Sequence, residues 1–258
     1  MSIYDRMISK AGKNGLYVDT RLERPEGVRV GQELRGNVVL KNGQGARRVR
    51  RISLELAAEF IYEKDKRIAK QSGVIYRYML DTDVSMASGE ERSIPFAFTI
   101  PFAAPVKLGP SNVWLETEVE TDPESVRTDK DSVTILPHPI VSAFFEAVGL
   151  LGLRLHEVSL LRMPDLQSSL PFVQEFEFKP RLPSALDEIE VYYLVKNERQ
   201  VDFYMEIDRR GKGLLGMLEE TFDWDERCVK VTLTDEDIAD PDRLADRLAH
   251  VIKPHLDL

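Results

Sequence analysis

A glycine-rich stretch in the second half of the chain has the spacing of a nucleotide-binding loop. Residues 211–216, Gly-Lys-Gly-Leu-Leu-Gly, fit G-x-G-x-x-G, a pattern in which backbone amides approach a pyrophosphate. The outer two glycines, Gly211 and Gly216, also have the spacing of a Walker loop. Either interpretation would predict a nucleotide-dependent enzyme, provided that a parallel strand leads into the loop and a helix follows it.

The residues around the loop do not supply these elements. Residues 201–208 have the composition of a strand, but residues 214–220 leave room for only about two helical turns, too few for a crossover between parallel strands. A Walker loop needs Lys-Ser/Thr after Gly216, where Met-Leu stands. We therefore interpret the glycines as a connection between antiparallel strands. A nucleotide- or small-molecule-dependent enzyme that uses Gly211–Gly216 is the alternative hypothesis.

Other reactive residue types form no catalytic or metal-binding pattern. The single cysteine, Cys228, excludes an intramolecular disulfide and a multi-cysteine metal site, and its apolar neighbours predict a buried, inert thiol. The histidines lack metal-ligand spacing and are expected in surface or linker positions; they are His138, His156, His250 and His255. The sequence thus predicts no catalytic residue, no cofactor-binding residue and no metal site.

Two clusters of basic residues are the candidate partner-binding sites. They are Arg47, Arg48, Arg50 and Arg51 in the first half, and Arg209, Arg210 and Lys212 beside the glycines. On a chain with a net charge of −9, such clusters can meet an acidic protein surface, phosphate or acidic lipid, or they can pair with carboxylates of the same chain. Arginines on a strand edge would also discourage aggregation between sheets.

The overall charge and hydropathy limit the class of partner and the location. A net charge of −9 over 258 residues argues against a general nucleic-acid binder, because neutralising phosphates supplies most of the affinity of such proteins. No window has the roughly 18 apolar residues of a membrane span, and the first residues lack the apolar core of a signal peptide. We expect a cytoplasmic protein. Peripheral membrane contact, through residues 3–8 or the arginines, is a further alternative.

Strand patterns dominate the chain and predict an all-β fold. Residues 112–121 alternate best, with apolar side chains on one face and charged ones on the other, where Trp114 needs a cover. Prolines 137 and 139 interrupt the pattern and place a domain boundary there. A short helix is expected just after it, followed by about five more strands.

The end of the chain changes to helical spacing. Asp240-Pro241 has the residue types of a helix start, a capping acid followed by proline at the first helical position. The apolar side chains then recur with helical period, at Leu244, Leu248, Val251 and Ile252. This pattern predicts a C-terminal amphipathic helix that packs on its own domain.

Several segments resemble a known family. Residues 30–40 (VGQELRGNVVL), 94–101 (IPFAFTIP) and 131–137 (DSVTILP) are similar to strand segments of arrestin-like proteins. In the second half, residues 174–180 (QEFEFKP) and 206–210 (EIDRR) resemble the sporulation-control, Spo-zero-M type family of arrestin-like proteins. The similarity extends from about residue 18 to residue 248.

The resemblance implies a fold and a role but no active site. It implies an N-terminal arrestin-like β-sandwich over 1–137 and a C-terminal β-sandwich with a terminal amphipathic helix over 138–258. It also implies a bacterial, cytoplasmic regulator or scaffold that acts through protein–protein contacts. The family has no known catalysis, so the resemblance assigns no catalytic residue to this sequence. Neither the partner nor the oligomeric state follows from the sequence.

Overall fold

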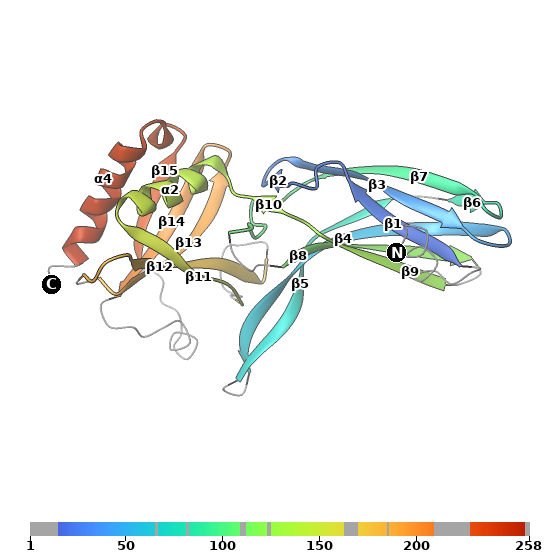
Figure 1. The fold of residues 1–258 in the computed structure, drawn as a ribbon, viewed down its shortest axis with the longest axis horizontal. Coiled ribbons are helices and arrows are strands. Elements are labelled where there is room, and N and C mark those ends of the chain that lie inside the picture. Colours follow the sequence, from blue (N-terminus) through green and yellow to red (C-terminus); the bar gives the residue numbers. More distant parts are fainter. Residues whose placement is uncertain are drawn as a thin grey trace. The chain divides into compact units, whose positions relative to one another are not determined.

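The computed structural model describes residues 15–64, 67–80, 83–108, 112–122, 125–162, 170–184, 186–208 and 228–255 (Figure 1). These residues are mostly strands, with the two α-helices α2 and α4, so the all-β prediction is confirmed. They divide into two compact units. The first comes from Met1–Ala58, Val74–Pro101 and Asn112–Ile135, the second from Glu59–Gly73, Phe102–Ser111 and Leu136–Leu258. A domain boundary at residue 137 stays a prediction.

The first unit is built mainly from two antiparallel sheets, and the short strands β2 and β10 pair separately. One has the order β1-β3-β7; the other contains β4-β8-β9, with β5 and β6 also paired to β4. The strand bounds are β1 Leu16–Leu22, β2 Val28–Arg29, β3 Glu33–Asn42, β4 Arg47–Lys64, β5 Arg67–Leu80, β6 Val84–Met86, β7 Glu91–Thr99, β8 Val113–Asp122, β9 Ser125–Ser132 and β10 Ile135–Leu136. β4 and β5 continue into the second unit.

Alternation of apolar and polar residues explains why these segments form strands. On β8, Val113, Leu115, Thr117 and Val119 are buried on one face, as the sequence predicts. Directly opposite on β4, Leu54 and Leu56 are fully buried. Each such side chain contributes about 1.5–3 kcal/mol when it leaves water, so the core of this unit is set by the alternating pattern.

Buried hydrogen bonds join the two sheets of the first unit. The Thr20 amide on β1 donates to Asp129 Oδ2 on β9 over 2.8 Å. The Thr20 hydroxyl lies 2.6 Å from the Thr117 hydroxyl on β8. All three side chains are buried. Since a buried carboxylate is stable only when it is hydrogen-bonded, these contacts fix how β1 meets β8 and β9.

A second buried polar residue, Asn42, ties two turns together. It ends β3 with 1% of its surface exposed. Its amide nitrogen lies within hydrogen-bond distance of three carbonyls, at 2.7 Å from Gly45 O, 2.9 Å from Ala87 O and 3.3 Å from Met86 O. The turn after β3 and the turn after β6 therefore share one side-chain donor group.

The variant Asn42→Ala should lower the free energy of unfolding by about 1–3 kcal/mol, because the carbonyls of Gly45, Met86 and Ala87 lose their shared donor. Urea unfolding followed by circular dichroism measures this change. Asn112→Ala, at an exposed position before β8, is the matched control and should change stability by less than about 0.5 kcal/mol. Equal unfolding midpoints for both variants would show that Asn42 does not hold the turns.

The second unit contains an antiparallel sheet of the order β11-β12-β13-β14-β15, and the end of β4 adds a parallel pairing to β11 at Ile61 and Leu161. Helices α2 and α4 lie on one face of it (Figure 1). The bounds are α2 Pro139–Leu150, β11 Leu153–Arg162, β12 Phe172–Pro180, β13 Glu188–Asn197, β14 Gln200–Asp208, β15 Val229–Thr234, α4 Pro241–Ile252, and the 3-10 turns Asp237–Ala239 and Lys253–His255. A second sheet facing this one, which a sandwich requires, is not among the described strands of this unit.

Aromatic contacts hold α2 against the sheet. Phe144 stacks on Phe203 of β14 with ring centroids 4.1 Å apart. Phe145 contacts Phe176 and Phe178 of β12 at 4.8 and 5.5 Å. His138, expected in a surface or linker position, is instead buried at the start of α2, where its Nδ1 accepts a hydrogen bond from the Ile140 amide.

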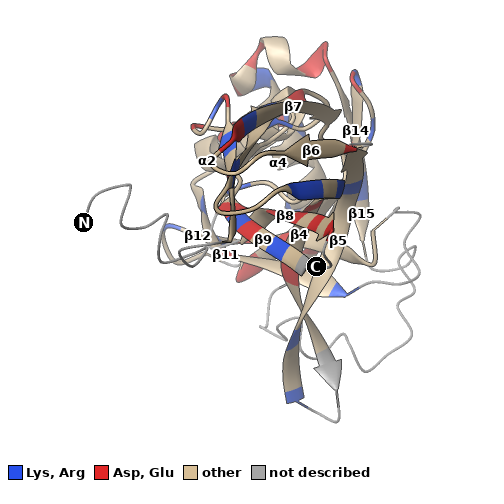
Figure 2. Ribbon diagram, turned by 90° about the vertical axis from the view of Figure 1, so that its right-hand side faces the viewer, with Lys and Arg blue, Asp and Glu red and all other residues tan. Residues whose placement is uncertain are grey.

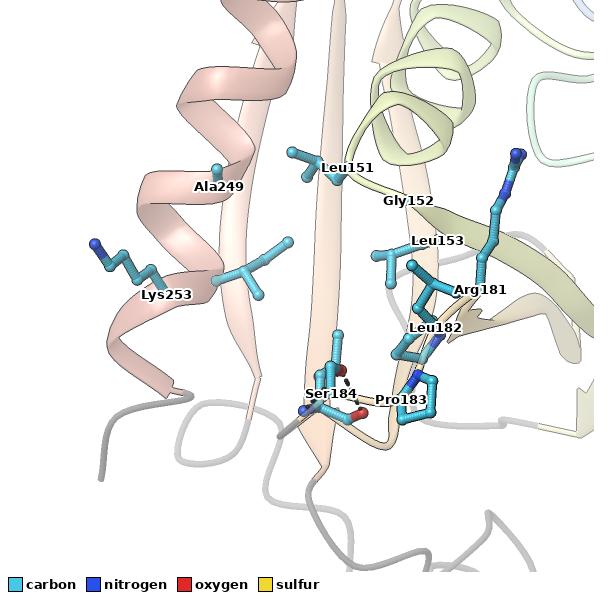
Figure 3. A pocket seen from close by; sticks show the side chains of 12 residues that line it. Leu151, Gly152, Leu153, Arg181, Leu182, Pro183, Ser184, Ala249 and Lys253 are labelled. Atoms are coloured by element: carbon cyan, nitrogen blue, oxygen red, sulfur yellow. Dashed lines mark hydrogen bonds between the residues drawn. The ribbon is translucent and has the colours of Figure 1, made fainter.

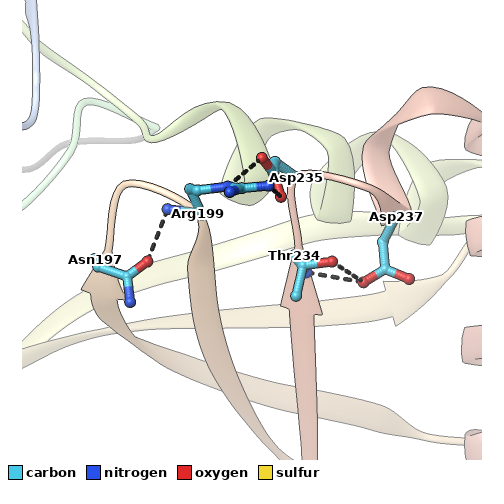
Figure 4. A network of polar contacts seen from close by, with 5 residues as sticks. All are labelled: Asn197, Arg199, Thr234, Asp235 and Asp237. Carbon is cyan, nitrogen blue, oxygen red and sulfur yellow. Dashed lines mark hydrogen bonds and ion pairs between the residues drawn. The ribbon is translucent and has the colours of Figure 1, made fainter.

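The start of α4 is fixed as the sequence predicts. Asp240 accepts a hydrogen bond from the Arg243 amide, and Leu244, Leu248 and Ile252 are buried. In the preceding segment, Asp237 accepts bonds from the amide and hydroxyl of Thr234, while Arg199 pairs with Asp235 at 2.7 Å (Figure 4). These contacts join the β13–β14 turn and β15 to the helix.

Candidate functional surfaces

The arginine cluster of the first unit begins β4 and makes contacts within its own unit. Arg48 forms a bidentate ion pair with Asp83. Its Nε donates to Oδ1 at 2.6 Å and its Nη2 donates to Oδ2 at 2.5 Å. Arg51 lies 3.3 Å from Glu120. Arg47 reaches the Thr121 hydroxyl at 3.3 Å and Arg50 the Thr121 carbonyl at 3.4 Å. A partner that used these arginines would have to compete with such contacts, and their role in binding stays a prediction.

The second basic cluster cannot be placed. Arg209, Arg210, Lys212 and the glycines of residues 211–216 all lie outside the described residues. Neither the partner-binding hypothesis for these three side chains nor the nucleotide hypothesis for the loop is tested by the structure.

The charged face of β4, β8 and β9 carries rows of opposite charge (Figure 2). Glu116 on β8 lies opposite Lys130 on β9. Trp114, which needed a cover on this face, is 8% exposed, and the Lys130 ammonium lies 3.6 Å from its ring centroid. A cation over an indole ring contributes roughly 0.5–2 kcal/mol. Lys130 thus covers the Trp114 ring from within the unit, while the buried indole Nε1 has no hydrogen-bond partner among the described residues.

Strand β5 is a different kind of surface, because it exposes apolar side chains along a strand edge. Among the described strands it pairs only with β4. In its part within the first unit, Val74, Tyr76 and Met79 are 39%, 38% and 45% exposed. Tyr76 also stacks on Phe98 at 5.2 Å, which holds its ring. An exposed apolar edge strand is a template for strand addition.

By contrast, the outer strand of the second unit is protected. On β15, the Thr232 carbonyl accepts a hydrogen bond from Arg247 at 3.0 Å, and the Thr234 amide donates to Asp237 at 2.8 Å. These side chains occupy backbone groups that an added strand would need. Strand addition is therefore less favourable at β15 than at β5.

One face of the second unit's sheet gathers carboxylates on neighbouring strands. Glu177, Glu190 and Glu206 lie directly opposite one another on β12, β13 and β14. One step along the strands, Glu175 lies opposite Tyr192. Glu175 and Glu190 are only 9% and 7% exposed. Acidic side chains at such spacing repel one another, and their burial adds to the free-energy cost of charging them.

Burial, reinforced by the neighbouring glutamates, raises the pKa of Glu175 to about 9. No ion pair to Glu175 is found among the described residues. Asp202, on the same sheet, is the opposite case: burial opposes its charge, but hydrogen bonds from Lys230 and Thr232 outweigh burial and lower its pKa below the ordinary value. The presence of nearby cations therefore determines that Asp202 is ionised while Glu175 keeps its proton.

The remaining side chains of this region do not form a catalytic arrangement within the described residues. Burial raises the pKa of the Cys228 thiol and that of the Tyr192 hydroxyl, which disfavours both nucleophilic forms. Nowhere in the described ranges do three or more His, Cys, Asp or Glu side chains gather as metal ligands would. None of the helices described is long and apolar enough to cross a membrane.

The variant Glu175→Gln should remove part of the pH dependence of stability. In the unfolded chain this carboxyl ionises near its ordinary pKa, whereas in the folded protein it keeps its proton up to about pH 9. Folding therefore takes up a proton between these pH values, and stability falls as pH rises through this window. At pH 8 the neutral glutamine should raise the midpoint of thermal unfolding by at least about 4 °C, and at pH 4.5 by much less.

Thermal unfolding across pH 4.5–9 measures this effect. Glu198→Gln, in the exposed β13–β14 turn, is the matched control and should leave the pH profile unchanged. If Glu175→Gln gave the same profile as wild type, the carboxyl would be ionised in the folded protein.

Comparisons with known proteins connect this structure to one family. The family model described as SpoOM protein matches residues 4–211. The sporulation-control protein spo0M of Bacillus subtilis (strain 168) is 31% identical over 255 residues, which are 98% of each chain. The crystal structure of Spo0M from Bacillus subtilis matches with a TM-score of 0.85, over 93% of this chain and 98% of the other. The sequence similarity and the fold therefore agree over almost the whole length.

Proposed function

The chain belongs to the SpoOM protein family, and we propose that it is a non-enzymatic regulatory scaffold that acts through contacts with other proteins. A regulatory role is supported by the Bacillus subtilis relative, which is a sporulation-control protein by name. We place the protein in the cytoplasm. The process that it regulates, and whether sporulation is part of it, depends on its partners.

The observation that carries the proposal is the apolar edge of β5. In its first-unit part, from residue 74 to residue 80, three large apolar side chains are more than one third exposed. Backbone groups at such an edge can pair with an extended segment of another protein, while the exposed side chains give it a selective apolar contact. β7 offers a poorer edge, because Pro95 within it cannot donate a hydrogen bond.

The two basic clusters are the proposed contacts for acidic residues of the same partners. Arg48 and Arg51 are exposed by 54% and 56% at their side chains, although each pairs with an acid. Exposed ion pairs contribute only about 0–1 kcal/mol, so a partner carboxylate can replace the internal one at small cost. We therefore propose that a partner pairs with the apolar edge of β5 and that its acidic residues contact the arginines.

The double variant Val74→Asp/Met79→Asp should weaken partner binding without unfolding the protein, because both side chains are exposed. Charges placed on the edge strand oppose strand addition and weaken binding by at least about tenfold. In-cell crosslinking of the tagged full chain in its native host, followed by identification of the crosslinked proteins, measures the loss. Val126→Asp is the matched control, because Val126 is 49% exposed on β9.

We expect at least one protein to crosslink to the wild type and to the control but not to the double variant. Crosslinking of the same proteins to all three would place the contact elsewhere than on β5. A rise in unfolding temperature on adding ATP or NAD, absent in Gly213→Val, would favour the enzyme hypothesis instead, because ligand binding to the folded state stabilises it.

A further inference from the structure

The free edge of β5 carries a cation between two aromatic residues. Arg77 lies in the first-unit part of the strand, between Tyr76 and Tyr78. Both tyrosine rings contact Phe98 of β7, with centroids 5.2 and 5.5 Å away. Arg77 instead reaches Glu55 of β4, where its Nε donates to Oε2 at 3.0 Å. Since neighbouring side chains on a strand point to opposite faces, the tyrosines face the sheet that contains β7 and Arg77 lies on the outer face.

On this outer face, Arg77 ends a row of charges that crosses four strands. Glu55 on β4 lies opposite Glu116 on β8, and Glu116 lies opposite Lys130 on β9. Each acid of the row therefore has a cation on one side. Beyond Arg77 the row is open, because among the described strands β5 pairs only with β4. A strand added at this edge would place one of its side chains directly opposite Arg77.

Arg77 has donors left for a second carboxylate. Its side chain is 61% exposed. Nε and Nη2 both donate to Glu55, and no bond from Nη1 is found among the described residues. Because an arginine presents five N–H donors, Nη1 can donate to an acid on an added strand while the bonds to Glu55 are kept. Opposite charges directly across a strand pair stabilise the pairing, and like charges oppose it.

The charge of the surrounding sequence favours an acidic partner. Residues 47–80 contain nine lysines and arginines and four aspartates and glutamates, a net charge of +5 on a chain whose total is −9. β5 itself contains no acid. Two copies of β5 side by side would therefore place no carboxylate opposite Arg77 and would add cations to a cationic edge. An acidic segment of another protein suits this edge better than a second copy of the chain.

We infer that the segment added to β5 is a strand in which an acidic residue stands between two large apolar residues. The acid lies opposite Arg77, and the apolar residues lie opposite Tyr76 and Tyr78, where they extend the contacts of the tyrosine rings. The inference rests on the proposed function, because it states the chemistry of the partner at the same edge. It gives that edge a selectivity for acidic segments that apolar contact alone would not give.

Synthetic peptides test this pattern. The probes are the fluorescein-labelled octapeptide Ser-Thr-Val-Glu-Val-Thr-Val-Ser and two relatives with Gln or Lys in place of Glu, and fluorescence anisotropy measures their binding to the full chain. The wild type should bind the Glu peptide about threefold to fivefold more tightly than the Gln peptide, and the Lys peptide most weakly. The double variant Val74→Asp/Met79→Asp should weaken binding of the Glu peptide, which would place it on β5.

Exchanging the charge at Arg77 should reverse this order. Arg77→Glu should bind the Lys peptide most tightly, and Arg77→Gln should lose the preference, while the exposed position lets both variants keep their fold. Arg92→Glu is the matched control, because Arg92 is a 50% exposed arginine that pairs with Glu90 at the edge strand β7. This control should bind the three peptides in the same order as the wild type.

Two results would overturn the inference and leave strand addition at β5 intact. They are equal binding of the three peptides by the wild type, with loss in Val74→Asp/Met79→Asp, and an unchanged order of peptides in Arg77→Glu. Absence of binding of all three peptides by the wild type would also overturn it, and dimers that the double variant lacks in sedimentation velocity would then identify a second copy as the occupant. The in-cell crosslinking does not depend on the peptide pattern, so it decides on the proposed function separately.

Discussion

The contact of Phe144 with Phe203 determines the layout of the second unit. The two rings are fully buried and their centroids lie 4.1 Å apart, which holds α2 against β14. α4 lies on the same face beside α2, with its leucine stripe inward (Figure 1). The two helices and the β12–β13 connection leave an apolar cavity of about 560 Å³ near the C-terminal ends of the helices (Figure 3). If this stack were lost, the position of α2 and the wall of the cavity would change together.

The same packing determines where the carboxylates go. Side chains on a strand alternate between faces, so a β12 that turns Phe176 and Phe178 toward α2 must turn Glu175 and Glu177 to the other face. The sheet then gathers several acids on one side, and among the described residues their ion-pair partners are Lys179, Lys196 and Lys230. Burying Glu175 uncharged costs free energy that an apolar side chain would not cost. Local conflicts of this kind are expected at functional or strained sites.

Most of the predictions that the structure confirms were based on sequence patterns that extend over only a few residues. The alternation in β8 and the capping pair Asp240-Pro241 act over a few residues, so a sequence shows them directly. Long-range packing is not visible in this way. The burial of His138 depends on Phe102, whose ring lies 6.1 Å away, and the cover of Trp114 depends on Lys130 from the next strand. The pKa of Glu175 depends on its burial and on glutamates from four strands, and the cavity depends on three segments far apart in the chain.

In the proposed binding of partners, the two kinds of surface on the first unit would contribute different things. Each arginine of the β4 cluster that contacts a partner first gives up an internal bond, as Arg48 would with Asp83, so the net gain in affinity from charge is small. The β5 edge gives up nothing comparable, because its apolar side chains already face water. Affinity should therefore come mainly from apolar burial and backbone pairing along β5, while the arginines determine which partners approach and in which orientation. On this proposal, changes of charge around the arginines would alter the choice of partner and leave the strand contact as it is.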